Sequence, residues 1–285
     1  MHRRDRLRRR TAQDRADAPQ LRLDGPPEGD RWSTYNDTGT LHGPQPRPDW
    51  VVDGAAAIDY ELGLVKTGKE ADVFLLERAI RETDRSTLLA VKRYRDLDHR
   101  AFRRDNAYLE GRVLRETRQR RAAANRSRFG RALLGGQWAV AEFDVLGALW
   151  ASGAPVPYPV QLVGTELVME WIGDDDGTAA PRLAETRYST DELESLWHQC
   201  IEAMTFLARA HLAHGDLSAY NLLVDGGRLV MIDVPQAVDI VTNPRGIEFL
   251  YRDARNAASW FASHGVASAD AESVMGELVA AAGLG

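Results

Sequence analysis

One loop, together with the strand that follows it, restricts the folds open to this chain. Residues 214–221 read His-Gly-Asp-Leu-Ser-Ala-Tyr-Asn, and an apolar strand predicted at residues 229–232 leads directly into Asp233. A long predicted helix precedes the loop, and the turn signal Asp-Gly-Gly at residues 225–227 predicts a hairpin before Asp233. An Asp followed five residues later by Asn, with a second Asp at a strand end, is typical of a phosphoryl-transfer site.

The side chains of Asp216, Asn221 and Asp233 have complementary chemistry. Asp216 would be the catalytic base that accepts the proton of an acceptor hydroxyl. Mg²⁺ prefers oxygen ligands and usually takes one or two carboxylates, which Asn221 and Asp233 supply as an amide oxygen and a carboxylate. Asp and Asn are also common in unrelated turns, but the helix, hairpin and strand end around these residues favour the functional interpretation.

Lysine is scarce, because the chain has 33 arginines and only three lysines, Lys66, Lys69 and Lys92. All three fall in the segment expected to form a nucleotide-binding sheet. A lysine retained where arginine otherwise supplies positive charge indicates a need for a compact point charge. Lys92 ends the sequence Leu-Ala-Val-Lys on a predicted strand and would contact the α- and β-phosphates of a nucleotide. A solvent-facing lysine on an alternating strand is the simpler alternative.

A carboxylate that pairs with Lys92 is expected on the next helix. Glu142 is the best candidate, because it lies in the apolar helix predicted at residues 138–152. Glu110 and Glu116 remain alternatives within a highly charged segment.

Residues 63–69 fit the start of a Walker A loop, but Glu70 stands where that loop needs Ser or Thr as a metal ligand. Residues 72–76 read as a strand, whereas a P-loop places its phosphate at a helix N-terminus. We therefore expect a turn between two strands. In this turn the backbone N–H groups of Gly68, Lys69, Glu70 and Ala71, with the Lys69 ammonium, face the phosphates, and Val73 follows on the second strand.

The remaining pattern predicts a sheet-rich half followed by a helical half. Strands are expected at 61–66, 72–78, 88–94, 160–163, 166–172, 222–224 and 229–232, and helices at 138–152, from the capping box at 189 to about 211, 245–263 and 268–282. Residues 1–50 are few in apolar side chains and are expected to be disordered. Gly135 and Gly136 are expected to separate a flexible Arg-rich loop, 96–136, from the first helix.

Composition narrows the partners and the compartment. The net charge is −6, so the surface as a whole is not basic, although Arg clusters at 3–10 and 95–131 could contact RNA or another polyanion. Solvated arginines are the simpler interpretation of these clusters. No apolar run approaches the ~20 residues of a membrane span. No secretory signal is apparent, and the single Cys200 allows no internal disulfide, so we expect a cytoplasmic protein without membrane partners.

Three segments together resemble the RIO family of atypical serine protein kinases. Residues 67–74, Thr-Gly-Lys-Glu-Ala-Asp-Val-Phe, are similar to its S-T-G-K-E-A-x-V-Y loop, and residues 214–221 are similar to its H-x-D-L-S-x-Y-N loop. Residues 232–236, Ile-Asp-Val-Pro-Gln, are similar to its I-D-V-x-Q segment. The resemblance covers about residues 55–265. Lys66, Ala219 and Pro235 depart from the family pattern without removing a catalytic group.

The resemblance implies an α+β, two-lobed protein-kinase-like fold, with a β-rich N-lobe at 51–172 and a helical C-lobe at 173–285. It also implies no activation segment and no peptide-docking helices, for which the 46 residues after Asp239 are too few. ATP would be the phosphoryl donor, with Mg²⁺, or alternatively Mn²⁺, as the metal. The backbone at Met169, Glu170 and Ile172 would bind adenine.

The activity implied is transfer of the γ-phosphoryl group to serine or threonine of a protein, including the chain itself. Asp233 is also implicated in the family as a phosphate acceptor, which would give an ATPase that forms an aspartyl-phosphate. Two alternatives stay open: a small-molecule kinase of the aminoglycoside or choline type, and an ATP-gated assembly factor that contacts RNA or a ribosomal particle through its Arg clusters.

Overall fold

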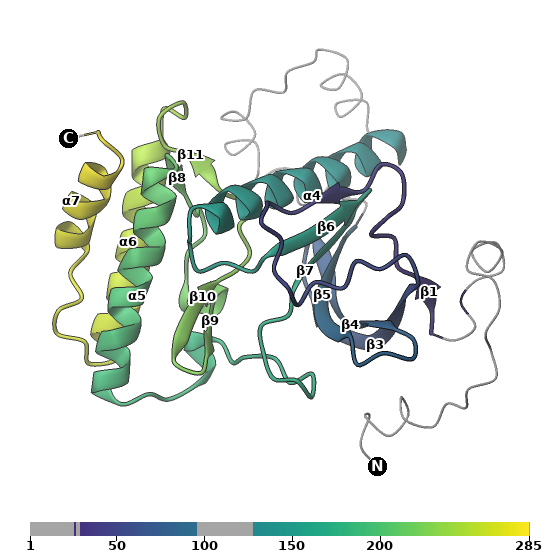
Figure 1. The fold of residues 1–285 in the computed structure, drawn as a ribbon. Coiled ribbons are helices and arrows are strands. Elements are labelled where there is room, and N and C mark those ends of the chain that lie inside the picture. The colour runs from purple at the N-terminus through teal and green to yellow at the C-terminus, as the bar shows by residue number, and fades with distance from the viewer. Residues whose placement is uncertain (1–25, 27–28, 96–127, 285) are drawn as a thin grey trace.

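The computed structural model describes residues 26, 29–95 and 128–284. Its main sheet is antiparallel and seven-stranded, in the order β1-β3-β4-β5-β7-β6-β2. The strands are β1 (Arg31–Trp32), β2 (Leu41–His42), β3 (Ala57–Thr67), β4 (Ala71–Ile80), β5 (Ser86–Tyr94), β6 (Pro159–Val163) and β7 (Glu166–Glu170). Figure 1 shows this sheet on one side of the molecule and the last helices of the chain on the other.

Alternating apolar residues explain how the sheet packs. Leu76, Leu89, Val91 and Val168 are fully buried and form one cluster on one face of the sheet, together with Tyr35 and Val51 from the segment before β3. The helix α4 (Arg128–Ala151) packs against β5, β6 and β7 on the opposite face, where its Leu146 shares a second cluster with Leu167 of β7 (Figure 1). The strand that will carry functional residues, β5, is therefore held between β4 and β7 and under a helix.

The expected break at Gly135 and Gly136 is wrong, since α4 runs continuously from Arg128. Glycine inside a helix costs about 1 kcal/mol relative to alanine, and tertiary packing compensates for it here. A Cβ added to Gly135 would lie 3.2 Å from the carbonyl oxygen of Arg95, so glycine lets α4 approach the end of β5 closely. Residues 96–127 of the expected loop lie outside the described residues.

The helical half contains two short strand pairs and three helices. Its elements are η1 (Leu183–Glu185), α5 (Thr190–Arg209), β8 (Leu212–Ala213), η2 (Ala219–Asn221), β9 (Leu222–Asp225), β10 (Arg228–Met231), β11 (Val238–Asp239), α6 (Gly246–Ser263) and α7 (Ala271–Ala281). The predicted capping box is present at the start of α5, where Ser189 and Glu192 bond each other's backbone N–H. Trp197 of α5 packs against Phe261 of α6, with ring centroids 5.1 Å apart, in the core of this half.

The strands and helices expected from residue 61 onward are all present. Most strands are longer than expected and α4 begins ten residues earlier, whereas β7, α5 and α7 are shorter. The expectation of disorder over residues 1–50 is wrong for residues 29–50. There β1 pairs with β3 and β2 pairs with β6, because short strands at the sheet edges need little sequence signal of their own. Residues 1–25 and 27–28 lie outside the described residues. No helix within the described ranges is long and apolar enough to cross a membrane.

Candidate active site

Four segments far apart in the sequence supply the candidate site. Lys92 lies on β5, Glu142 lies on α4, Asp216 and Asn221 lie between β8 and β9, and Asp233 follows β10. The first two elements belong to the sheet half and the others to the helical half (Figure 1). The fold therefore joins the two halves of the chain at residues that the sequence singled out.

Lys92 is the centre of a buried charge cluster. Its Nζ donates to Glu142 Oε1 at 2.8 Å and to Asp233 Oδ1 at 2.7 Å. Lys92 is 9 % exposed and Glu142 is 1 % exposed. Burial alone lowers the pKa of Lys92, but the charges of Glu142 and Asp233 outweigh it and raise that pKa above its ordinary value. Lys92 is therefore a fixed ammonium held between two carboxylates.

Glu142 is fixed through both of its carboxylate oxygens. Residues 92 and 94 point to the same face of β5, so the Tyr94 hydroxyl also reaches Glu142 and donates to Oε2. Burial raises the pKa of Tyr94, and the Glu142 charge raises it further, so this hydroxyl remains a donor. The structure thus pairs Glu142 with Lys92, whereas Glu110 and Glu116 lie outside the described residues.

Asp233 faces both Lys92 and solvent. Its side chain is 40 % exposed, and its backbone has φ = +65°, in the left-handed region that non-glycine residues rarely adopt. Partial burial raises the pKa of Asp233, but the Lys92 charge outweighs this and lowers the pKa below its ordinary value. The result is an ionised carboxylate on a strained backbone, a combination found at functional sites.

The loop that carries Asp216 is joined to the strand that carries Asp233. The Asp216 N–H donates to His214 Nδ1 at 3.4 Å, and His214 Nε2 lies 3.1 Å from the carbonyl oxygen of Ile232. Because Nδ1 accepts a backbone N–H, the fully buried His214 carries a ring proton on Nε2, which points at the Ile232 carbonyl oxygen. His214 therefore braces the loop, while the Asp216 side chain remains exposed.

Asn221 lies in the same network. Its Nδ2 donates to the Asp216 carbonyl oxygen at 2.8 Å, and its own carbonyl oxygen accepts from the Ile232 N–H at 2.9 Å. The side-chain oxygen Oδ1 is left for another partner. Within residues 29–95 and 128–284, no three His, Cys, Asp or Glu side chains form a metal-binding group, so a cation here would rely on Asn221, Asp233 and ligands that the protein does not supply.

Asp253 on α6 is a loop-positioning residue that the sequence reasoning missed. It is 2 % exposed and accepts from the N–H groups of Gly215 at 2.8 Å and Leu217 at 3.1 Å. Burial raises its pKa, and these bonds and the nearby positive charges oppose that rise. The available signal was an Asp on the apolar stripe of a predicted helix, between the buried residues Leu250 and Ala257. Such a buried carboxylate needs donors, and the candidate catalytic loop supplies them.

The residues expected to cover phosphates form a turn between β3 and β4, as predicted. Gly68 lies close to the backbone of Ala71, because a Cβ added to Gly68 would lie 2.9 Å from the Ala71 carbonyl oxygen. One expectation is wrong: the Gly68 N–H donates to that oxygen at 2.9 Å and is not available to a phosphate. Lys69 is exposed at the turn, and the Glu70 carbonyl oxygen accepts from Arg95 N at 2.8 Å.

Sheet register places a second lysine beside Lys92. Val73 of β4 lies opposite Lys66 on β3 and opposite Lys92 on β5. Residues directly opposite in neighbouring strands point to the same face, so Lys66 and Lys92 share a face of the sheet two strands apart. Burial and the charges of Arg182 and Lys92 lower the pKa of Lys66 below its ordinary value, and the Asp233 charge opposes this only in part.

The segment expected to bind adenine lies at the end of β7. Met169 pairs with Ala90 of β5, close to Lys92. The Glu170 N–H donates to the Tyr158 carbonyl oxygen at 2.9 Å, and the Ile172 carbonyl oxygen accepts from Ala180 N at 3.0 Å. The Glu170 N–H is therefore already engaged within the protein, whereas the Ile172 carbonyl oxygen keeps a second lone pair.

Comparison with known proteins identifies related chains. The pattern of the RIO domain family matches residues 77–274. The chain is 38 % identical over 224 residues to the RIO-type serine/threonine-protein kinase Rio1 of Haloferax volcanii, covering 79 % of this chain and 70 % of that one.

Two eukaryotic relatives match over a smaller share of their own length. The chain is 38 % identical over 136 residues to serine/threonine-protein kinase RIO3 of Homo sapiens, covering 47 % of this chain and 26 % of that one. It is 33 % identical over 205 residues to serine/threonine-protein kinase RIO1 of Caenorhabditis elegans, covering 72 % of this chain and 37 % of that one.

Proposed function

Because the chain belongs to the RIO domain family, we propose that it is a serine/threonine protein kinase that transfers the γ-phosphoryl group of ATP to a serine hydroxyl of a protein. The observation that carries this proposal is Lys92 held by Glu142 and Asp233 at 2.8 and 2.7 Å. A positive charge fixed before the substrate arrives stabilises phosphate charge without reorganisation during the reaction. Asp216, on the loop braced against the same strand end, supplies the base.

The sheet half binds the nucleotide in this proposal. Lys92 contacts the α- and β-phosphates, while Lys69 and the backbone of the β3–β4 turn cover them. Val73 and the end of β7, at Met169, Glu170 and Ile172, border the base. Residues 51–172 then act as the N-lobe and residues 173–285 as the C-lobe. Only 12 residues separate Asp233 from the start of α6 at Gly246, which supports a fold without an activation segment.

Asn221 and Asp233 fit a divalent cation. Both offer hard oxygen ligands, and Asp233 is ionised and partly exposed, which suits Mg²⁺ bound together with phosphate oxygens and water. When bound, the cation would neutralise charge on the phosphates. The amide orientation of Asn221, with Nδ2 donating to Asp216, keeps its oxygen available on the other side.

Asp216 receives the acceptor proton. A serine Oγ attacks the γ-phosphorus, the bond from that phosphorus to the bridging oxygen of ADP breaks, and the serine proton moves to the Asp216 carboxylate. The side chain of Asp216 is exposed, whereas its backbone is held through His214 and through the neighbouring Gly215 by Asp253. This arrangement keeps the base in place and leaves it open to a macromolecular acceptor.

A second function is favoured by one feature of Asp233. Its carboxylate is ionised, 40 % exposed and set on a strained backbone. Its oxygen is therefore able to attack the γ-phosphorus while the bond from that phosphorus to the bridging oxygen breaks and ADP leaves, which gives an aspartyl-phosphate that water then hydrolyses to inorganic phosphate. The protein would then be an ATPase, and its RNA or ribosomal partners would be contacted by the Arg clusters at 3–10 and 95–131. Most of those residues lie outside the described residues.

Incubation with γ-³²P-labelled ATP and Mg²⁺, followed by mass spectrometry of the products, separates these functions. The kinase proposal predicts label on serine that resists hydroxylamine. Label on Asp233 that hydroxylamine removes would support the ATPase. Label in small metabolites, with none in protein, would support a small-molecule kinase and contradict both.

A further inference from the structure

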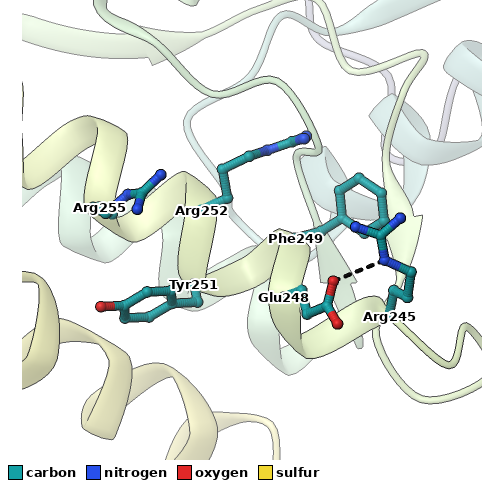
Figure 2. Close-up of a pocket in the computed structure, with 6 residues that line it drawn as sticks. All are labelled: Arg245, Glu248, Phe249, Tyr251, Arg252 and Arg255. Atoms are coloured by element: carbon teal, nitrogen blue, oxygen red, sulfur yellow. Dashed lines mark hydrogen bonds and ion pairs between the residues drawn. The ribbon is translucent and has the colours of Figure 1, made fainter. Parts of the chain in front are cut away.

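A second charged site lies on α6, outside the cluster around Lys92. It is a pocket of about 220 Å³, which we name the α6 pocket, and it is lined by Arg245, Glu248, Phe249, Tyr251, Arg252 and Arg255 (Figure 2). Most of these residues follow one another at spacings of three or four, so they lie along one side of the helix. Three arginines against one glutamate make the pocket positive in a chain whose net charge is −6.

Two of the three arginines of the α6 pocket contact the Phe249 ring, and one of these also forms an ion pair. Arg245 Nε lies 2.8 Å from Glu248 Oε2. In the described ranges no carboxylate oxygen lies within 4.0 Å of the guanidinium of Arg252 or Arg255, although the charge of Arg252 also acts on the buried Asp253 carboxylate. The guanidinium carbons of Arg252 and Arg245 lie 4.7 and 5.8 Å from the centroid of the Phe249 ring. An aromatic ring positions a guanidinium group and leaves its N–H groups free for an anion.

Arg252 links the α6 pocket to the candidate catalytic loop. Its guanidinium donates to the carbonyl oxygen of Gly215, the residue before Asp216. Consecutive α-carbons are about 3.8 Å apart, so an anion bound by the remaining N–H groups of Arg252 lies near the base. A segment bound in the pocket would therefore present neighbouring residues to Asp216.

The surroundings of the α6 pocket suit a polypeptide better than a nucleic acid. Val241, just before α6, is 54 % exposed, and Ile247, one turn before Tyr251, is 42 % exposed. Apolar side chains beside arginines are typical of protein interfaces, whereas nucleic-acid binding relies mainly on rows of phosphate contacts. The carboxylates of Asp216 and Glu248 would repel a continuous polyanion, whereas a single acidic side chain can be placed between them.

We propose that the α6 pocket binds the carboxylate of an Asp or Glu side chain that lies close to the phosphorylated serine in the acceptor protein. This inference rests on the proposed function, because it names the class of acceptor used by the same active site. The carboxylate accepts charge-assisted hydrogen bonds from Arg252 and Arg255, and apolar residues of the acceptor contact Val241 and Ile247.

The test measures binding, so it does not depend on turnover. Fluorescently labelled serine peptides carry one Glu at each position from two to six residues on either side of the serine, and matched peptides carry Gln. We expect at least one Glu peptide to bind about three- to tenfold more tightly than its Gln partner, as for an exposed or partly buried charge pair. In Arg255→Gln this preference disappears, while Arg187→Gln, at an exposed arginine outside the pocket, retains it.

Charge reversal provides a second test of the same contact. Arg255→Glu should favour a Lys peptide over the Glu peptide at the position identified above. Equal binding of Glu and Gln peptides at all positions, or a preference that Arg255→Gln leaves intact, would overturn the proposal. Loss of poly(U) binding in Arg255→Gln, with the peptide preference unchanged, would assign the pocket to nucleic acid and also overturn it.

Failure of the proposed function would look different. If the wild-type protein transferred no phosphate to serine but still preferred the Glu peptide, the kinase proposal would fail and the α6 pocket would stand as an acidic-peptide site. Phosphate transfer without any charge preference would leave the kinase proposal intact and remove this inference.

Discussion

Lys92 and Arg252 both place a positive charge beside the candidate catalytic loop, but they differ in burial and in the groups that they contact. Lys92 is 9 % exposed and contacts two carboxylates, whereas Arg252 is exposed and contacts a ring and a backbone oxygen. A buried charge must be paired, because desolvation is otherwise too costly. An exposed charge needs no partner and is screened by solvent. In the function proposed above, the Lys92 cluster would bind the phosphates, and the α6 pocket would set which acceptor is preferred.

Asp216 lies between these two regions, and its substitution should have the largest effect. Asp216→Asn keeps the side-chain shape but removes the base, so serine phosphorylation should slow by about 10²–10⁴-fold. The unfolding free energy should hardly change, since the side chain is exposed. Steady-state transfer assays with Asp84→Asn, at an exposed turn, serve as the control. Unchanged turnover in Asp216→Asn would remove Asp216 from the mechanism.

Glu142 and Glu248 provide a direct comparison of buried and exposed ion pairs. Glu142→Gln removes a partner of buried Lys92, and we expect an unfolding free energy lower by roughly 3 kcal/mol, the lower end for a broken buried pair because Asp233 remains. Glu248→Gln breaks a pair whose side chains are 62 % and 65 % exposed, and should lower it by less than about 1 kcal/mol. Urea titrations measure both. Equal effects would show that burial does not distinguish the two regions.

Asp253 anchors the catalytic loop from the helix that carries the α6 pocket. Asp253→Asn leaves one of the two loop N–H groups poorly bonded, so we expect a stability loss of about 1–3 kcal/mol. Because the loop positions Asp216, kcat should fall while the KM for ATP stays close to the wild-type value. A change confined to stability, with kcat intact, would make Asp253 purely structural.

Lys66 should give the smallest effect, because it is an exposed ammonium on the same face as Lys92. Lys66→Ser restores the residue usual in related loops and removes one charge near the phosphates. We expect the KM for ATP to rise about two- to fivefold with little change in kcat, as for an exposed charge contact. Arg228→Ser, at an exposed hairpin, should change neither constant. A KM that stays constant in Lys66→Ser would place its ammonium outside the nucleotide site.

Much of the fold was predictable because local pattern and tertiary structure agree. The strand that carries Lys92 contains a continuous buried apolar run, Leu89 to Val91, and α5 begins at a capping box followed by an apolar stripe. The sequence failed where packing outweighs local preference. Gly135 indicated a helix break, yet its small size is what allows α4 to pass Arg95. The edge strand β1 has only two residues, and its pairing with β3 could not be read from them.

The candidate site shows the same division. Lys92, Asp216, Asn221 and Asp233 were identifiable from residue type and spacing, because the chemistry of phosphoryl transfer requires those groups. Their roles stay predictions. The hydrogen bonds that hold the loop were not identifiable from the sequence. Asp253 lies 37 residues after Asp216, and its bond from the Gly215 N–H forms only when α6 packs against the loop. The engaged N–H of Gly68 was missed for a similar reason, because turn type decides which amides remain free.

The central claim is that Lys92, Glu142 and Asp233 form one phosphoryl-transfer site with the Asp216 loop, and Lys92→Arg tests it most directly. Arginine keeps the buried positive charge, so the protein should remain folded, but its planar guanidinium cannot replace a compact ammonium between two carboxylates. The measurement is the rate of ³²P transfer from γ-labelled ATP to serine. We predict a fall of about 10²-fold or more, and a rate equal to that of the wild type would contradict the account.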